Sequence, residues 1–427
     1  MMWKKPSFWN TEFKKFKQAY SDPVMHKNRI YTQDITVSLD RKKTRRNGHT
    51  FLLTSGREAC QWLYVNILQA NSNYVIPDFN GEVYNDTHQY LRDNGYQVHV
   101  LNISNPAEGM HYNPITCMQL YGNSYTESIE NTISAMLYRH KAADPFKYKT
   151  SETLLRAMLH YVKCLPEEQQ TIETLKSLMP DSKIDKRKPW DGGVMRATSR
   201  SYMVQQCLDV LRHVPGVMLL ESALDVYTAL SYVEMMNTNG EAFDMTQLTS
   251  GKHVIYINYS NPAWHKEIIS LFYTQLLDAL YSAAENSKTY RLDENWLFFA
   301  DQWHYDLARR LATSSKYNIN FAVHTRMLSE LKYTYPDEWE CIISNCDVLL
   351  YAPGIGCNET DYMTRCLRSV EKPGVSNESL VKIELSKITP EQCVVCVRGL
   401  KPFLCTKYSW QQHPNSMELP QRGGQIV

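Results

Sequence analysis

The sequence predicts an α/β protein whose open, parallel sheet has helices on both faces and is interrupted by an all-α insertion. Two observations carry this prediction. Short apolar runs bounded by turn residues, typical of buried strands, alternate with helix-length segments before residue 118 and again after residue 240. The stretch between them contains helical patterns and no good strand candidate. With 427 residues, the chain has room for about two or three domains.

The composition is that of an ordinary globular protein and excludes several classes. Hydrophobic residues make up 43% and charged residues 21%, while 17 glycines and 18 prolines are too few for a fibrous or low-complexity chain. No window of about 18 residues is apolar enough for a transmembrane helix, and no secretory leader is recognisable. The 11 irregularly spaced cysteines favour reduced thiols, so we expect a cytoplasmic protein.

The net charge of +1 conceals a basic N-terminal segment. Residues 1–50 hold 12 Lys or Arg against 4 Asp or Glu, a local charge of +8, and the remaining residues together carry −7. The body of the protein is therefore not a basic surface built to grip nucleic acid.

Residues 1–29 are expected to form a basic, aromatic helix and leader. Lysines alternate with aromatic residues that recur at helical spacing, namely Trp9, Phe13, Phe16 and Tyr20. Such a helix could lie on the inner face of the plasma membrane as a peripheral anchor, or it could pack on its own domain. A second basic cluster, 41–46, could contact DNA phosphates.

Strands are predicted on both sides of the insertion. In the first part of the chain they lie at 51–53, 74–76 and 96–101, and the 20 residues between the first two can hold one crossover helix. After the insertion, with helical stretches between them, strands are expected at 253–257, 297–300, 319–323, 348–351 and 393–397.

The insertion's helices are predicted from caps and apolar periodicity. Ser124 and Glu127 have the spacing of a capping box, and Thr150 is placed to cap the next helix. Further helices are expected near 171–179, 198–213 and 219–237.

Carboxylates follow two of the predicted strands. Asp78 comes directly after the strand at 74–76, and Asp301 directly after the strand at 297–300. An acidic residue at the carboxyl end of a parallel strand is where α/β nucleotide enzymes hold the water ligands of a metal. A carboxylate that caps the next helix explains the same pattern equally well.

The order of these segments resembles that of the TraG-type type IV coupling proteins, closest to the branch found on conjugative elements of Gram-positive bacteria. The stretch 73–84, which contains Asp78, Asn80, Gly81 and Glu82, is similar to the family's Asp-Pro-Lys-Gly-Glu block. Later blocks keep the family's order, at 273–276, 330–347, 359–362, 390–403 and 407–414. The resemblance runs from about residue 30 to 415, and its specificity lies in the joint order of the blocks.

This resemblance implies a RecA-like, P-loop NTPase-type core built from 30–118 and 240–410. The all-α insertion would be 119–239, and 411–427 would form a C-terminal tail. Members of the family are usually membrane-anchored hexamers that feed relaxase-bound DNA to a secretion channel.

The family's phosphate-binding loop is degraded in this sequence. A motor needs a glycine-rich loop around the phosphates, followed by Lys and then Ser or Thr. The corresponding stretch holds Ser55, Gly56 and Arg57, with one glycine and no such lysine. Glu58 would place a negative charge beside the phosphates.

The other nucleotide motifs show comparable losses. Asp301 could still hold a water bound to Mg²⁺, but Gln302 replaces the family's Glu and cannot take a proton from the attacking water. Arg326 stands where the family has a Gln, and Phe79 and Asn80 replace the proline and lysine of the Asp-Pro-Lys-Gly-Glu block.

These losses predict a catalytically silent, coupling-protein-like component of a conjugative DNA-transfer system, with neither nucleotide nor metal as a cofactor. It would bind relaxase or accessory proteins, or join active homologues in a homo- or hetero-oligomer, and DNA contact stays open. The alternative is an active, ATP- and Mg²⁺-dependent motor with an atypical site. A third hypothesis is a decaying copy with no role beyond folding.

Overall fold

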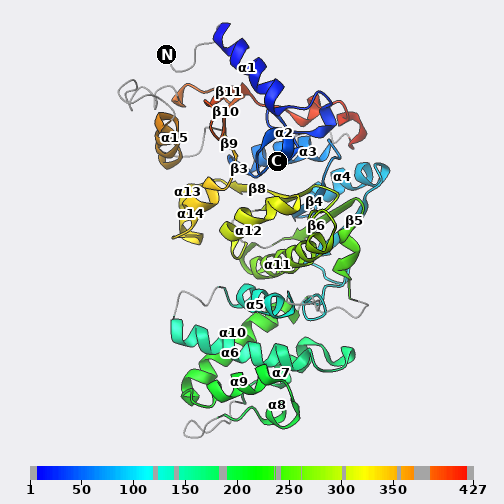
Figure 1. Ribbon diagram of the computed structural model, residues 1–427, viewed down its shortest axis with the longest axis vertical. Helices are drawn as coiled ribbons and strands as arrows, with labels where there is room; N and C mark the ends of the chain where they lie inside the picture. Colours follow the sequence, from blue (N-terminus) through cyan, green and yellow to red (C-terminus); the bar gives the residue numbers. More distant parts are fainter. Residues whose placement is uncertain are drawn as a thin grey trace.

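Figure 1 shows an elongated molecule with the sheet in its upper part and a block of helices in its lower part. The computed structural model describes residues 7–118, 124–138, 144–181, 190–234, 236, 242–260, 262–300, 304–352, 357–369 and 385–420. Short 3₁₀ helices supplement the elements given below, at Met25–Lys27, Glu167–Gln169, Met245–Thr249, Ser315–Tyr317, Trp410–Gln412 and Ser416–Glu418.

A large mixed sheet forms the upper part of the molecule. Its strands are β3 (Thr50–Leu53), β4 (Asn73–Phe79), β5 (Gln97–Asn102), β6 (His253–Tyr259), β7 (Trp296–Ala300), β8 (Ile319–Thr325), β9 (Val348–Tyr351), β10 (Gln392–Val397) and β11 (Phe403–Thr406). Within the described residues their order is β11-β10-β9-β3-β8-β7-β4-β6-β5. The pairs from β9 to β5 are parallel, whereas β10 runs antiparallel to both β9 and β11. The strands predicted from the sequence are all present, and β11 is an addition.

Helices cover both faces of this sheet, as predicted (Figure 1). Successive side chains of a strand point to opposite faces, so Phe51 and Leu53 of β3 join one core and Leu52 joins the other. The first core lies under α11 (Pro262–Asn286), α12 (Leu307–Ser314), α13 (Leu328–Thr334), α14 (Trp339–Ser344) and α15 (Cys357–Ser369). The second lies under α1 (Ser7–Tyr20), α3 (Gly56–Ile67) and α4 (Glu82–Asp93).

The N-terminal helix α1 packs on the protein itself. Phe16 is only 3% exposed, and its ring centroid lies 5.3 Å from that of Phe403 in β11. Phe13 and Tyr20 are partly buried against the same core. The described aromatic rings of this segment therefore pack on the protein's own domain, one of the two alternatives that the sequence left open. Among the described residues, no helix is long and apolar enough to cross a membrane.

A small antiparallel hairpin and a short helix connect α1 to the sheet. They are β1 (Asn28–Ile30), β2 (Thr36–Ser38) and α2 (Arg41–Thr44). At the other end of the chain, the described part of the tail returns to the same side. The Asn415 side-chain amide donates to the Leu68 carbonyl at 3.1 Å and to the Tyr90 hydroxyl at 3.0 Å.

In the lower block, the regular elements described between β5 and β6 are all helices, as predicted. They are α5 (Ser124–Leu137), α6 (Pro145–Val162), α7 (Ile172–Ser177), α8 (Gly193–Thr198), α9 (Tyr202–Leu211) and α10 (Gly216–Glu234). This block has its own core, with Leu154, Leu208 and Leu230 fully buried. Its predicted boundaries, 119 and 239, fall outside the described residues and stay a prediction.

The prediction that Thr150 caps a helix is wrong. Helix α6 begins earlier, at Pro145, and the Asp144 carboxylate accepts the N–H groups of Phe146 and Lys147. Proline suits the first position of a helix because its missing N–H would have no partner there. Thr150 lies inside the helix, where its hydroxyl donates to the Phe146 carbonyl at 3.0 Å. The Ser124 side chain, part of the other predicted cap, is outside the described residues.

A buried polar cluster links the helical block to the sheet. The Asn131 amide of α5 donates to Asp278 of α11, with N–O distances of 3.1 and 3.2 Å. Arg310 of α12 forms an ion pair with the same carboxylate at 3.0 Å, and its side chain is only 3% exposed. A charge this deeply buried depends on its partner for stability.

We expect Asp278→Ala to lower the free energy of unfolding by about 3–5 kcal/mol, because it leaves Arg310 buried and uncompensated. The control is Asp209→Ala, which breaks the Arg196–Asp209 ion pair of the same 3.0 Å length at an Asp side chain 66% exposed. The control should change stability by less than about 1 kcal/mol. Urea unfolding measures both, and equal losses in the two variants would contradict the importance of the buried pair.

Candidate functional site

The residues predicted to form a nucleotide site follow the carboxyl ends of the parallel strands. The ends of β3 and β8 are adjacent, since the Thr54 N–H donates to the Thr325 carbonyl at 3.3 Å. The His324 ring, also on β8, lies with Nε2 3.0 Å from the Thr54 carbonyl oxygen. The end of β4, which carries Asp78, is separated from β3 by β8 and β7. Three strand spacings amount to roughly 14 Å, so the predicted residues form two separate groups.

The connection from β3 to α3 is only two residues long, because β3 ends at Leu53 and α3 begins at Gly56. Ser55 is the N-cap, and its hydroxyl oxygen accepts the Glu58 N–H at 3.3 Å. In return, the Glu58 carboxylate accepts the Ser55 N–H at 3.3 Å and its hydroxyl at 3.2 Å. This reciprocal capping box satisfies donors that a phosphate-binding turn would leave open.

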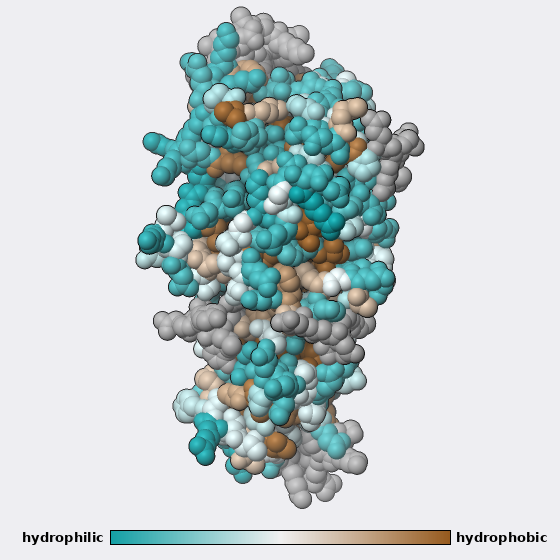
Figure 2. Space-filling view, turned by 90° about the vertical axis from the view of Figure 1, so that its right-hand side faces the viewer, coloured by the Kyte–Doolittle hydropathy of each residue, from teal (hydrophilic) through white to brown (hydrophobic). Residues whose placement is uncertain are grey.

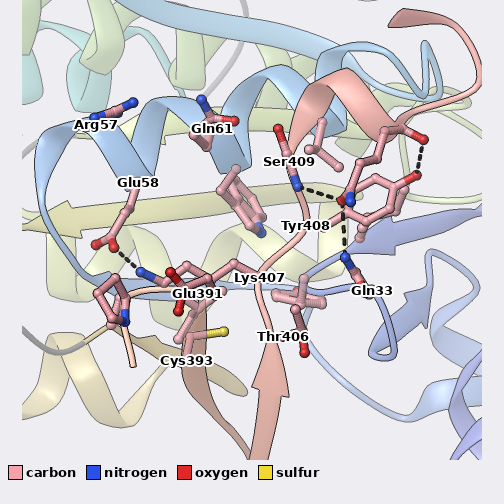
Figure 3. Close-up of a pocket in the computed structure, with 18 of the residues that line it drawn as sticks. Gln33, Arg57, Glu58, Gln61, Glu391, Cys393, Thr406, Lys407, Tyr408 and Ser409 are labelled. Carbon is pink, nitrogen blue, oxygen red and sulfur yellow. Dashed lines mark hydrogen bonds and ion pairs between the residues drawn. The ribbon is translucent and has the colours of Figure 1, made fainter. Parts of the chain in front are cut away.

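A lysine from the far end of the chain completes this turn. Lys407, in the segment after β11, forms an ion pair with Glu58 (Figure 3). Arg57, the neighbouring cation, is exposed. A P-loop needs backbone N–H groups wrapped around the phosphates and a lysine directed at them. Here the turn is too short to surround a phosphate. The Glu58 carboxylate already accepts the Ser55 N–H and pairs with Lys407. The residues present do not fit a nucleotide held in the P-loop manner.

A cavity of about 590 Å³ lies beside α3. Figure 3 shows Glu58 and Lys407 pointing toward each other on one side, with Tyr408, Ser409 and Gln33 on the other. Trp62 also lines the cavity. It is 5% exposed, and its indole N–H has no hydrogen-bond partner among the described residues. The lining thus combines aromatic rings with polar and charged groups and could hold a small polar ligand or a partner's side chain.

Asp78 acts as the cap of the next helix, the second of its two predicted roles. Its carboxylate oxygens accept the N–H groups of Val83 at 3.0 Å and Tyr84 at 2.8 Å, at the start of α4. The residue is only 1% exposed. Burial raises the pKa of Asp78 to about 6, although the two N–H donors act in the opposite direction.

The residues after Asp78 shape the turn into α4. Asn80 and Gly81 both have positive φ, of 60° and 74°. A Cβ on Gly81 would come within 3.2 Å of the Asn258 amide nitrogen, so both the conformation and the close approach favour glycine. Asn80 and Glu82 are exposed to solvent. Nothing in this turn directs a side chain toward the β3–α3 connection.

The remaining predicted residues follow β7 and β8 in the chain. Asp301 and Gln302, after β7, are outside the described residues. Arg326 is exposed, and its guanidinium lies 3.7 Å from the Glu330 carboxylate in a solvent-facing pair. Sequence analysis did not single out Lys407, Glu391 or Trp62 as site residues. Lys407 and Glu58 are 349 positions apart, so no local pattern could have paired them.

Comparison with known proteins settles the family. A family model described as type IV secretory system conjugative DNA transfer matches residues 26–365. This chain belongs to that family. The resemblance to TraG-type coupling proteins is thereby confirmed. No curated protein matches the sequence.

Solved structures support the fold. The plasmid coupling protein TrwB in complex with ADP and Mg²⁺ superposes with a TM-score of 0.66 at 11% identity, over 93% of this chain and 92% of that one. The unbound bacterial conjugative coupling protein TrwBdeltaN70 gives 0.65 at 12% identity, with the same coverage. VirB4 of Thermoanaerobacter pseudethanolicus gives 0.55 at 13% identity, over 91% of this chain and 97% of that one. The predicted RecA-like α/β fold is confirmed.

The raised pKa of Asp78 predicts a pH-dependent stability. The folded state holds this proton more tightly than the unfolded chain, so the contribution is complete below about pH 4 and is lost as the pH rises through about 6. Full deprotonation should remove about 3 kcal/mol. We expect the wild type to lose stability relative to Asp78→Asn between pH 4 and 7, measured by urea unfolding. The exposed-carboxylate control, Glu168→Gln in the helical block, should track the wild type. A constant difference between wild type and Asp78→Asn would show that the pKa is not raised.

Proposed function

We propose that this protein is a catalytically silent component of a conjugative DNA-transfer system that acts by binding other proteins. The observation that carries the proposal is the two-residue β3–α3 connection, closed by the Ser55–Glu58 capping box. The ion pair between Glu58 and Lys407 supports it, because it keeps a carboxylate where the family's loop would receive phosphate. On this proposal, neither ATP nor Mg²⁺ is a cofactor.

The second candidate is an ATP-driven motor with an atypical nucleotide site. TrwB has been solved with ADP and Mg²⁺ bound, which favours a nucleotide role somewhere in this fold. In this chain, such a role would require phosphate contacts outside the β3–α3 turn. The cavity beside α3, with Arg57 and Trp62 in its lining, is the place where an atypical site would have to lie.

We expect no saturable binding when the purified protein is titrated with a fluorescent ATP analogue and Mg²⁺, and no ATP turnover. Gln302→Glu alone should not create activity, because general-base assistance is worth about 10²–10⁴-fold and acts only on bound substrate. An active coupling protein assayed in parallel serves as the positive control. Micromolar binding with turnover in the wild type would establish the motor instead.

Partner binding is proposed to reside in the helical block, which exposes many large apolar side chains. They are Phe146, Val194, Tyr202, Val210, Val217, Leu224 and Tyr227. Val217 and Leu224 are two turns apart on α10 and so share a side of it. Phe146, at the start of α6, is tied to α10 through the neighbouring Lys147–Asp225 ion pair of 2.9 Å. Figure 2 shows hydrophobic residues interspersed among hydrophilic ones over the lower, helical part.

The partners that fit this proposal are a relaxase, accessory transfer proteins, or active homologues joined in an oligomer. The proposed location is the cytoplasm. Any attachment to the inner face of the plasma membrane would use Lys14, Lys15 and Lys17, which are exposed, while the ring of Phe16 is buried. DNA contact is not required.

We expect the double variant Phe146→Ser, Leu224→Ser to lose at least about tenfold in affinity for the transfer protein that the wild type captures. These side chains are 77% and 64% exposed, so their removal should leave the fold intact while removing apolar contact area. The control is Tyr333→Ser, on α13 and 90% exposed, which should bind like the wild type. Quantitative pull-down with relaxase and accessory proteins measures the effect. An unchanged affinity in the double variant would move the binding surface elsewhere.

A further inference from the structure

The basic cluster at 41–46 is partly turned inward. The side chains of Arg41 and Arg46, together with Arg29 of β1, line a cavity of about 20 Å³. Gly48, just before β3, and Asn320, near the start of β8, complete its wall. The cavity therefore lies at the amino ends of the parallel strands, opposite the edge that carries Ser55, and it is independent of the proposed function.

Arg29 is the deepest of the three cations. It is 3% exposed, and its Nη2 reaches two neutral oxygens, Ser72 Oγ at 3.4 Å and Asn295 Oδ1 at 3.2 Å. Its Nη1 has no hydrogen-bond partner, and no carboxylate among the described residues forms an ion pair with it. Burial lowers the pKa of Arg29, while Tyr31 and Tyr74 act in the opposite direction.

The other two guanidinium groups also lack a carboxylate partner where the chain is described. Arg41 donates to the carbonyls of Arg46 and Ser315. Arg46 lies over the Tyr20 ring, 5.4 Å from its centroid, and its Nε–H is buried without a partner.

The nearby carboxylate of Asp347 is already engaged. It accepts the Asn47 N–H at 2.6 Å and pairs with Arg398 at 2.8 Å. Burial lowers the pKa of Arg41, the positive charge of Arg291 lowers it further, and Asp347 acts in the opposite direction. The positive charge around the cavity thus exceeds the negative charge available to it.

We propose that this cavity binds one monatomic anion, chloride under ordinary conditions, held by Arg29, Arg41 and Arg46. The volume suits a single water or a single small ion and is too small for phosphate or sulfate. A water molecule could accept from the unpartnered N–H groups and donate to Asn320 Oδ1, a buried acceptor of the lining that has no partner among the described residues, but it would leave the buried positive charge uncompensated. A halide accepts from the N–H groups and also compensates that charge. It also joins α1, through Arg46 and Tyr20, to the amino end of β8.

The test is thermal unfolding of the full chain at constant ionic strength, with chloride exchanged for gluconate, which is too large for the cavity. Ligand that binds only the folded state raises the unfolding midpoint with its concentration. We expect a saturable rise with chloride and with bromide in the wild type. Arg29→Met and Arg46→Gln should each lose this rise. Arg57→Gln, an exposed arginine elsewhere, should keep it.

Chloride NMR gives a direct measurement on the same proteins. Exchange with a buried site broadens the ³⁵Cl line, so the wild type and Arg57→Gln should broaden it and Arg46→Gln should not. If Arg29→Met does not fold, Arg46→Gln decides both experiments. Equal midpoints in chloride and gluconate, or broadening that Arg46→Gln leaves unchanged, would overturn the proposal and leave water in the cavity.

Discussion

The length of the β3–α3 connection constrains everything that this edge of the sheet can do. β3 lies between β8 and β9, with helices on both faces, so neither the strand nor α3 can shift without disturbing a core. Two residues turn the chain from strand to helix but cannot encircle a phosphate group. The Ser55–Glu58 capping box closes the turn, and Lys407 pairs with the same carboxylate. The segment that follows β11 is thereby held against the first residues of α3.

In the second group of predicted site residues, a carboxylate likewise caps the start of a helix. Asp78 places its carboxylate on the N–H groups that begin α4, as Glu58 does at α3. Helix N-termini carry partial positive charge, and an internal carboxylate neutralises it. A phosphate approaching either helix would meet a negative charge instead of open donors. Both carboxylates therefore stabilise helices at positions where related enzymes bind anions or metals.

Much of the fold could be predicted from the sequence because it rests on local patterns. Buried parallel strands are continuous apolar runs, so β6 to β9 were predicted to within two residues at their ends, and the antiparallel but equally apolar β10 to within one. The strands that were missed carry weak signals. β1 is a three-residue, largely polar strand, and β11 is a four-residue edge strand close behind another strand. At α6, the Asp-Pro start signal was overlooked in favour of Thr150.

The candidate site could be predicted only in part, since its meaning depends on distant contacts. The residues at 51–61 were enough to predict the loss of the glycine-rich loop, but they could not predict the pairing of Glu58 with Lys407. The position of Asp78 was consistent with either a metal site or a helix cap, and the sequence could not show that its carboxylate accepts the N–H groups of Val83 and Tyr84. Likewise, the sequence pattern predicted a basic cluster at 41–46 but not that Arg41 and Arg46 would line a small cavity with Arg29.

A single substitution would not give the β3–α3 turn the features of a P-loop. Glu58→Lys would supply a cation near the right place, but it would remove half of the capping box, because the Ser55 N–H would lose its acceptor. It would also set two lysine charges against each other, because Lys407 would face the new side chain in place of a carboxylate. The connection would still be two residues long, so the backbone N–H groups that cradle phosphates would still be missing. Lengthening the β3–α3 connection first would break the capping box and separate Lys407 from α3. Each step toward P-loop binding of a nucleotide therefore destabilises the present arrangement before it gains a contact to phosphate.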